Sequence, residues 1–257
     1  TMSGSEDEFI ARHVARLPRK DQDSFWALHD CHLFGSKVTA QGIFRTNAIA
    51  AGEGHGEGVR NGVYLIGSCF NHSCCPNVTR VWLESEGVEV FHAARDIKAG
   101  EELCVYYQNV HQTKISRQAL LLEAFKFSCT CDSCKLEGAA LEKSDMLREE
   151  YRRLDDEILC CADSRKGIEK VKRIISIIEE EFAGNPWDLK RSYYDGFQMA
   201  FALGLQLGDM AEAKVMMKKA IESQIMCEGN HNDNQMLKWK YWLENPMASI
   251  SNMQKSI

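Results

Sequence analysis

The 257-residue sequence has no long apolar run, no excess of basic residues and no secretory leader pattern. No stretch approaches the roughly 20 apolar residues that a helix needs to cross a bilayer, so we expect no membrane partner. Lys and Arg total 31 while Asp and Glu total 37, a net charge of −6. Direct nucleic-acid binding needs a basic face and is therefore not expected. No charged segment followed by an apolar one opens the chain, so nothing suggests secretion.

The composition is otherwise that of an ordinary globular protein. Hydrophobic residues make up 44% and charged residues 26% of the chain, enough for a core in one large domain or two modest ones. The 11 cysteines are an odd number and too sparse for a disulfide scaffold. We therefore expect a reducing compartment, the nucleus and/or the cytoplasm, with some cysteines on a metal, and a monomeric chain.

The middle of the sequence differs in character from its ends. Between residues 35 and 107 glycines become frequent, and β-rich runs alternate with turn-forming residues. Strands are predicted at 78–83, 88–93 and 102–107, and the glycine-rich stretch 51–62 is predicted to be a flexible surface loop.

Helical periodicity dominates elsewhere. Residues 1–8 are small and acidic and are expected to be disordered, and short helices are predicted around 9–17 and 25–29. Longer helices are predicted at 113–127, 147–161, 168–182, 193–207, 210–226 and 235–243. The pattern predicts an α+β protein with an N-terminal helical segment (1–34), a β-rich part (35–138) and an all-helical domain (139–257).

The first group of chemically informative residues is Cys129-x-Cys131-x-x-Cys134. Three cysteines this close can hold one zinc ion tetrahedrally but leave one corner empty, so a structural site needs a remote thiolate. Free buried thiols are the alternative, and they are the more common state of an isolated cysteine. The candidates for the fourth ligand are Cys31, Cys69, Cys74, Cys75, Cys104, Cys160, Cys161 and Cys227.

Two further segments are informative through their order. The run Asn71–Asn77 (NHSCCPN) is polar and turn-forming and directly follows an apolar stretch, and its proline favours an extended backbone at Cys75. The run Gly100–Tyr107 (GEELCVYY) reads as a turn, two acids and a strand that ends in two tyrosines. Each alone is compatible with an ordinary structural role.

The combination is not ordinary. Asn-His-Ser-Cys-x-Pro-Asn, then Arg-Asp-Ile-x-x-Gly-Glu-Glu-Leu, a Tyr and finally Cys-x-Cys-x-x-Cys resembles the second half of a SET domain with its post-SET zinc motif. SET domains are S-adenosylmethionine-dependent protein lysine methyltransferases. The helical C-terminal part makes the SMYD subfamily and its fungal relatives the most similar. The resemblance implies S-adenosyl-L-methionine and Zn2+ as cofactors and a lysine-bearing protein, such as a histone tail, as substrate.

The resemblance also assigns roles to individual residues. The Asn-His pair contacts the cofactor in this family, together with upstream residues, and an aromatic residue before the post-SET cysteines packs on the adenine. The cofactor-binding residues implied here are Asn47, Ser68, Asn71, His72 and Phe127. The tyrosine that ends the Gly-Glu-Glu-Leu strand lines the methyl-transfer channel, which implies Tyr107 as the catalytic residue. The family's fourth zinc ligand corresponds to Cys74, beside Cys129, Cys131 and Cys134.

One family feature is not found. SET domains begin with a Gly-x-Gly turn that approaches the methionine end of the cofactor, whereas the glycines at 52–58 lie in a hydrophilic loop with no preceding strand expected. Since the chain opens on Thr1, we expect the N-terminal part of the domain to be missing. Weak cofactor binding and an uncovered sheet edge near Phe44 or Ile66 would follow. No MYND zinc finger is visible, because only Cys31 precedes Cys69.

The helical C-terminal part resembles tetratricopeptide pairing. Ala213, Met217 and Ala220 have the small-large-small spacing of such a repeat, although a plain helical core fits equally well. Two functions therefore compete: a protein lysine methyltransferase, and a catalytically weak SET remnant that binds peptides as a scaffold. A zinc hydrolase is disfavoured, because four thiolates leave no position for water.

Overall fold

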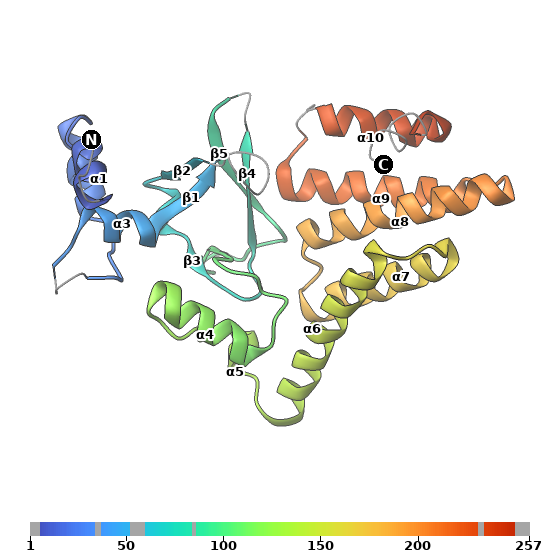
Figure 1. Cartoon of the computed structure of the whole chain (residues 1–257), viewed down its shortest axis with the longest axis horizontal. Helices are drawn as coiled ribbons and strands as arrows, with labels where there is room; N and C mark the ends of the chain where they lie inside the picture. The colour runs from blue at the N-terminus through green and yellow to red at the C-terminus, as the bar shows by residue number, and fades with distance from the viewer. Residues whose placement is uncertain (1–5, 34–36, 52–59, 84–85, 231–233, 250–257) are drawn as a thin grey trace.

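The computed structural model describes residues 6–33, 37–51, 60–83, 86–230 and 234–249. Three short helices lie at one end of the molecule, small β-sheets occupy the middle, and long paired helices form the other end (Figure 1). No helix in this described part is long and apolar enough to cross a membrane.

The N-terminal helices are α1 (Glu6–Val14), α2 (Arg19–Trp26) and α3 (Ala40–Asn47). Their small core consists of Val14, Phe25, Ala40 and Ile43. The expectation of disorder up to residue 8 is wrong for residues 6–8, because three acidic side chains form the first turn of α1, where the helix dipole favours negative charge. Helix α3 lies in the region expected to be β-rich, and its cap residue Thr39 accepts a hydrogen bond from the backbone of Gly42.

The strands of the described residues form three two-stranded sheets. β1 (Ala48–Ala51) pairs antiparallel with β2 (Arg60–Val63), and β4 (Val78–Leu83) pairs antiparallel with β5 (Val88–Ala93). The short strands β3 (Asn71–His72) and β6 (Cys104–Val105) run parallel. The predicted strands at 78–83 and 88–93 are confirmed, whereas the one at 102–107 is reduced to two residues.

The loop predicted at 51–62 is wrong at both ends, since Ala51 belongs to β1 and residues 60–62 belong to β2. The expectation that no strand precedes the glycine-rich run is wrong as well, because β1 ends directly before Gly52. The glycines at 52–58 themselves lie outside the described residues. Of the two apolar residues expected at an uncovered sheet edge, Ile66 is 81% exposed and Phe44 is half-buried.

Helix α4 (Lys114–Phe125) brings the end of the β-rich part back toward β3 (Figure 1). Its cap residue Thr113 accepts a hydrogen bond from Ser116. Lys126 ends the helix with a left-handed backbone (φ 60°), and this change of direction precedes Phe127 and the cysteines. The short helix α5 (Asp132–Lys135) carries the last of these cysteines, Cys134.

The C-terminal part is helical from Gly138 onward. It contains α6 (Gly138–Leu159), α7 (Ser164–Glu181), α8 (Pro186–Leu207), α9 (Ala211–Glu228) and α10 (Asn234–Glu244). α8 starts seven residues earlier than predicted, because Asn185 caps it and the proline occupies its first turn, where the missing N–H costs nothing. Ala213, Met217 and Ala220 are fully buried. The tetratricopeptide likeness remains a prediction, as does the division into three parts.

The helical and β-rich parts are in contact. Helix α9 packs on β4 and β5 (Figure 1), and the Thr79 hydroxyl donates to the carbonyl of Cys227 at 2.8 Å. His111 stacks on Tyr151 of α6 with ring centroids 4.4 Å apart, and its Nε2 lies 3.1 Å from the carboxylate of Asp188. These contacts connect the strand region to three helices of the C-terminal part.

Candidate functional site

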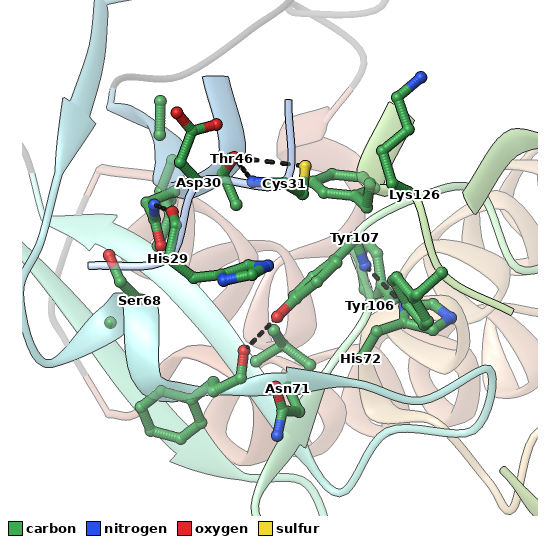
Figure 2. A pocket seen from close by; sticks show the side chains of 18 of the residues that line it. His29, Asp30, Cys31, Thr46, Ser68, Asn71, His72, Tyr106, Tyr107 and Lys126 are labelled. Carbon is green, nitrogen blue, oxygen red and sulfur yellow. Dashed lines mark hydrogen bonds between the residues drawn. The ribbon is translucent and has the colours of Figure 1, made fainter. Parts of the chain in front are cut away.

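A cavity of about 600 Å³ lies between five parts of the chain (Figure 2). They are the loop between α2 and α3, α3 itself, the turn before β3, the end of β6 and the segment after α4. Segments far apart in the sequence therefore share one wall. All six residues expected at a cofactor and catalytic site line it: Asn47, Ser68, Asn71, His72, Tyr107 and Phe127. Their individual roles remain predictions.

Tyr107 is held at two points. Its hydroxyl donates to the Phe70 carbonyl at 2.7 Å, and its backbone N–H donates to Nδ1 of His72 at 3.0 Å. Figure 2 shows the Tyr107 hydroxyl directed into the cavity, with Asn71 and His72 beside it. Burial raises the pKa of Tyr107, so the phenol stays protonated near neutrality. A neutral, fixed hydroxyl is thus available at the cavity wall.

The predicted Asn-His pair is already engaged within the protein. The Asn71 amide donates to Glu102 at 2.7 Å. Burial lowers the pKa of His72 to about 4, so the ring is neutral. Since Nδ1 accepts from Tyr107, we assign the ring proton to Nε2, which lies 3.4 Å from Sγ of Cys74. His72 therefore connects the tyrosine to the cysteine cluster.

Asn77 has a larger structural role than the sequence indicated. It is only 3% exposed, and its amide nitrogen donates to a Glu101 carboxylate oxygen at 2.9 Å and to the Glu102 carbonyl at 2.8 Å. Its amide oxygen accepts from the Cys104 backbone at 2.8 Å. This side chain replaces missing sheet hydrogen bonds and aligns β6 with the turn after β3. The only sequence signal was its place behind Pro76.

The loop before α3 forms a wall that sequence reasoning missed. Asn47 donates to the carbonyls of His29 and Ile43, both at 2.7 Å, and so fastens this loop to the end of α3. His29, Asp30 and Cys31 line the cavity (Figure 2). No recognisable motif marks this loop, since its placement depends on tertiary contacts.

Asp30 organises that loop from inside. The residue is 4% exposed and accepts backbone hydrogen bonds from His32 at 2.8 Å and Thr39 at 3.0 Å. Burial acts to raise the pKa of Asp30, but these backbone donors lower it overall, so the carboxylate stays ionised. A Cβ at Gly42 would lie 2.2 Å from the Asp30 carboxylate oxygens, which explains a glycine inside α3.

The four predicted metal ligands converge. Sγ atoms of Cys74, Cys129, Cys131 and Cys134 all lie within 4.8 Å of one another. Three of the residues are buried and Cys131 is half-buried. Cys75, the neighbour set aside in the sequence, does not join this group among the described residues. Four thiolates about 2.3 Å from a central zinc ion would be separated by distances of this order.

The surroundings of the cluster fit a metal-bound thiolate set. Arg117 is 2% exposed, and it donates from Nε to Cys74 Sγ at 3.2 Å and from Nη2 to Cys134 Sγ at 3.9 Å. A buried guanidinium needs an anionic partner, which four neutral thiols would not supply. Zinc with four thiolates carries a net charge of −2, so Arg117 offsets part of it, as outer-shell donors commonly do.

Comparisons with known proteins agree with this geometry. The SET domain family model matches residues 7–108, from α1 to just beyond Tyr107. The chain is 29% identical to Histone-lysine N-methyltransferase set5 of Schizosaccharomyces pombe over 247 residues, which cover 95% of this chain and 74% of that protein. It is 37% identical over 81 residues to Protein-lysine N-trimethyltransferase SMYD5 of Mus musculus, 30% of this chain and 20% of that protein.

A third relative is Histone-lysine N-methyltransferase ATXR4 of Arabidopsis thaliana, 35% identical over 89 residues, 34% of this chain and 27% of that protein. Residues 7–108 are thus similar to a SET domain. These comparisons confirm the resemblance found in the sequence, which is to the SET-domain family of protein lysine methyltransferases.

Proposed function

We propose that the protein transfers a methyl group from S-adenosylmethionine to the ε-amine of a lysine in a protein substrate. The observation that carries this proposal is the single cavity in which Tyr107 meets Asn71, His72 and Phe127. Methyl transfer requires that a cofactor site and an amine channel share one space, and these residues come from three separate segments.

The chemistry needs an aligned, uncharged amine. S-adenosylmethionine supplies the methyl group from a sulfonium centre. The hydroxyl of Tyr107 and the carbonyl of Phe70 are polar atoms fixed 2.7 Å apart at the wall and are suited to orient an incoming amine. Aromatic side chains of Phe125 and Phe127 belong to the same wall. Such surroundings remove water from the amine and lower its pKa, which favours the nucleophilic form.

We assign the cysteine cluster to a structural zinc ion. Four thiolates fill its coordination sphere, so no position remains to activate a substrate. Its contribution is to hold Cys129 and the preceding Phe127 beside Cys74 and His72. The chain's own residues then keep the cavity closed on that side, whatever ligand occupies it.

The names of the relatives support a proposal for the substrate class. Set5 and ATXR4 are named for histone lysine and SMYD5 for protein lysine. We therefore propose a histone or another lysine-bearing protein as substrate, action in the nucleus and/or the cytoplasm, and a monomeric enzyme. The net charge of −6 suits a basic protein tail better than a nucleic acid.

The test is methyl transfer with radiolabelled S-adenosylmethionine and purified histones as acceptors. Tyr107→Phe removes the hydroxyl and keeps the ring, so turnover should fall by about 10²-fold or more while cofactor affinity changes little. Tyr241→Phe is the matched control, because Tyr241 lies 56% exposed on α10. Equal turnover in both variants would contradict the role of Tyr107.

The scaffold alternative makes a different prediction. Its basis is that the Gly-x-Gly cofactor turn is not found in the sequence, which implies weak binding of the cofactor's amino-acid end. A chain that binds lysine peptides but shows no calorimetric signal with S-adenosylmethionine would favour the scaffold. Micromolar cofactor binding with product formation would exclude it.

A further inference from the structure

One cation of the cavity wall has no role in the site described above. Arg80 lies in the middle of β4 and lines the cavity together with Tyr106 and Tyr107. Its side chain is 34% exposed, so it is neither buried in the sheet nor free in bulk solvent. Its charge also acts on the phenol of Tyr106, which places the guanidinium near the tyrosine pair.

Arg80 is anchored from behind by a buried acid. Nη1 donates at 3.0 Å to Oε1 of Glu89, a β5 residue whose side chain is 1% exposed. The second carboxylate oxygen of Glu89 has no hydrogen-bond partner among the described residues. This pairing offsets part of the cost of burying Glu89 and holds the guanidinium at one nitrogen. A guanidinium has five N–H donors, and this bond uses one.

We propose that Arg80 is a carboxylate-binding residue of the cavity, an inference that rests on the proposed methyl-transfer function. A planar guanidinium held at one nitrogen presents its remaining donors as a fork, which matches a carboxylate in two parallel hydrogen bonds. Two carboxylates can reach a methyl-transfer cavity: the α-carboxylate of the cofactor and an acidic side chain next to the target lysine.

The other polar groups of the wall are less suited to this task. Lys126 is exposed, and its Nζ donates to the carbonyl of Glu123 at the end of α4. Asp30 is anionic and occupied by backbone donors. The cofactor's amino-acid end would lack a partner if the Gly-x-Gly turn is missing. Arg80 would offer this end of the cofactor a charged partner from β4.

The experiment compares two nucleosides by calorimetry on the full chain. S-adenosylhomocysteine carries the amino-acid carboxylate, and 5′-methylthioadenosine lacks it. If the cofactor is the source, Arg80→Gln should weaken S-adenosylhomocysteine binding about ten- to hundredfold and leave 5′-methylthioadenosine unchanged. Arg80→Lys keeps the charge without the fork and should give an intermediate loss. Arg165→Gln, an exposed position on α7, is the matched control.

The second arm uses peptide pairs in which the target lysine is flanked by Asp or by Asn. If the substrate is the source, S-adenosylhomocysteine affinity stays constant in Arg80→Gln, whereas the preference for the Asp peptide, read as KM, disappears. Arg80→Gln leaves the buried Glu89 carboxylate unpaired, which can destabilise the fold. Both arms are therefore repeated with the double variant Arg80→Gln/Glu89→Gln, which removes that buried charge.

The outcomes separate the two proposals. Wild-type protein that binds neither nucleoside and methylates no peptide would overturn the proposed function. Wild-type protein that binds and methylates, with both arms unchanged in the single and double variants, would overturn the assignment of Arg80 alone.

Discussion

Buried apolar side chains form one continuous core in the C-terminal helices, whereas the described residues before Gly138 form two small clusters. In the helical part, aromatic and branched residues from α6 to α10 pack on one another, with Phe197 and Phe201 each 1% exposed. In the strand part, three two-stranded sheets surround a cavity. One region therefore has ample hydrophobic stabilisation and the other does not.

The strand part compensates with specific polar contacts. Asn77 replaces sheet hydrogen bonds, Asp30 collects backbone donors, and Arg117 donates to the cysteine cluster. A small apolar cluster in this part contains Cys74 and Cys129 themselves. The comparison indicates that the part around the cavity depends on the cysteine cluster and on a few buried polar side chains, while the helical half is stable through packing.

Metal removal is expected to have the largest effect and to affect the two regions differently. Treatment with a zinc chelator, or Cys74→Ser, should unfold the cavity region, because structural zinc contributes folding free energy directly. Hydrogen exchange should accelerate in β3, β6 and α4 and stay slow in α7 and α8. Cys75→Ser is the matched control at the neighbouring position. Uniform loss of protection across both halves would show that they unfold as one unit.

Phe197→Ala is the reciprocal change in the helical half. Removing a fully buried phenylalanine leaves a cavity and should lower the free energy of unfolding by about 3–5 kcal/mol. Urea titration followed by circular dichroism measures this loss, and the zinc content per chain should remain unchanged. Loss of zinc in this variant would mean that the helical core also supports the metal site.

The same contrast explains what the sequence could predict. The C-terminal helices were recognisable because their apolar residues repeat at helical spacing, as in Ile168, Val171 and Ile175 of α7. The strands 78–83 and 88–93 were recognisable by composition and flanking turns. α3 was missed because glycine, asparagine and threonine made residues 40–47 look irregular, and tertiary packing on α1 decided the outcome.

The residues of the candidate site likewise fall into those that the sequence could predict and those that it could not. Motif residues such as His72 and Tyr107 could be named in advance because fixed spacing carries the family resemblance. Asp30, Arg80 and Arg117 could not, since each acts through a partner at least nine residues away that only the fold brings close. Buried charge pairs leave no local pattern in a sequence, which is why the cavity's electrostatics came from the structure alone.

A smaller effect is expected at the edge of the metal cluster. Arg117→Met removes the buried donor to Cys74 and Cys134 and keeps much of its volume, so zinc affinity should fall about 10–100-fold. Chelator competition measures the affinity. In the cobalt-substituted protein, the sulfur-to-metal charge-transfer band should also shift to lower energy, because the thiolates lose hydrogen bonds. The zinc affinity of Arg117→Lys should lie between those of the wild type and Arg117→Met. An unshifted band in Arg117→Met would contradict the role of Arg117 as a hydrogen-bond donor to the thiolates.

The smallest effect is expected from the helix caps, which allow a direct test because the same kind of cap occurs in both halves. Thr39 caps α3 by accepting from Gly42 at 2.9 Å, and Asp163 caps α7 by accepting from Arg165 at 3.0 Å. Replacing either cap with alanine should cost about 1 kcal/mol. If the halves are independent, Thr39→Ala should raise hydrogen exchange only around the cavity and Asp163→Ala only in the helical part. Equal effects of both variants on one shared transition would instead show that the contacts between α9 and the sheet couple the two regions.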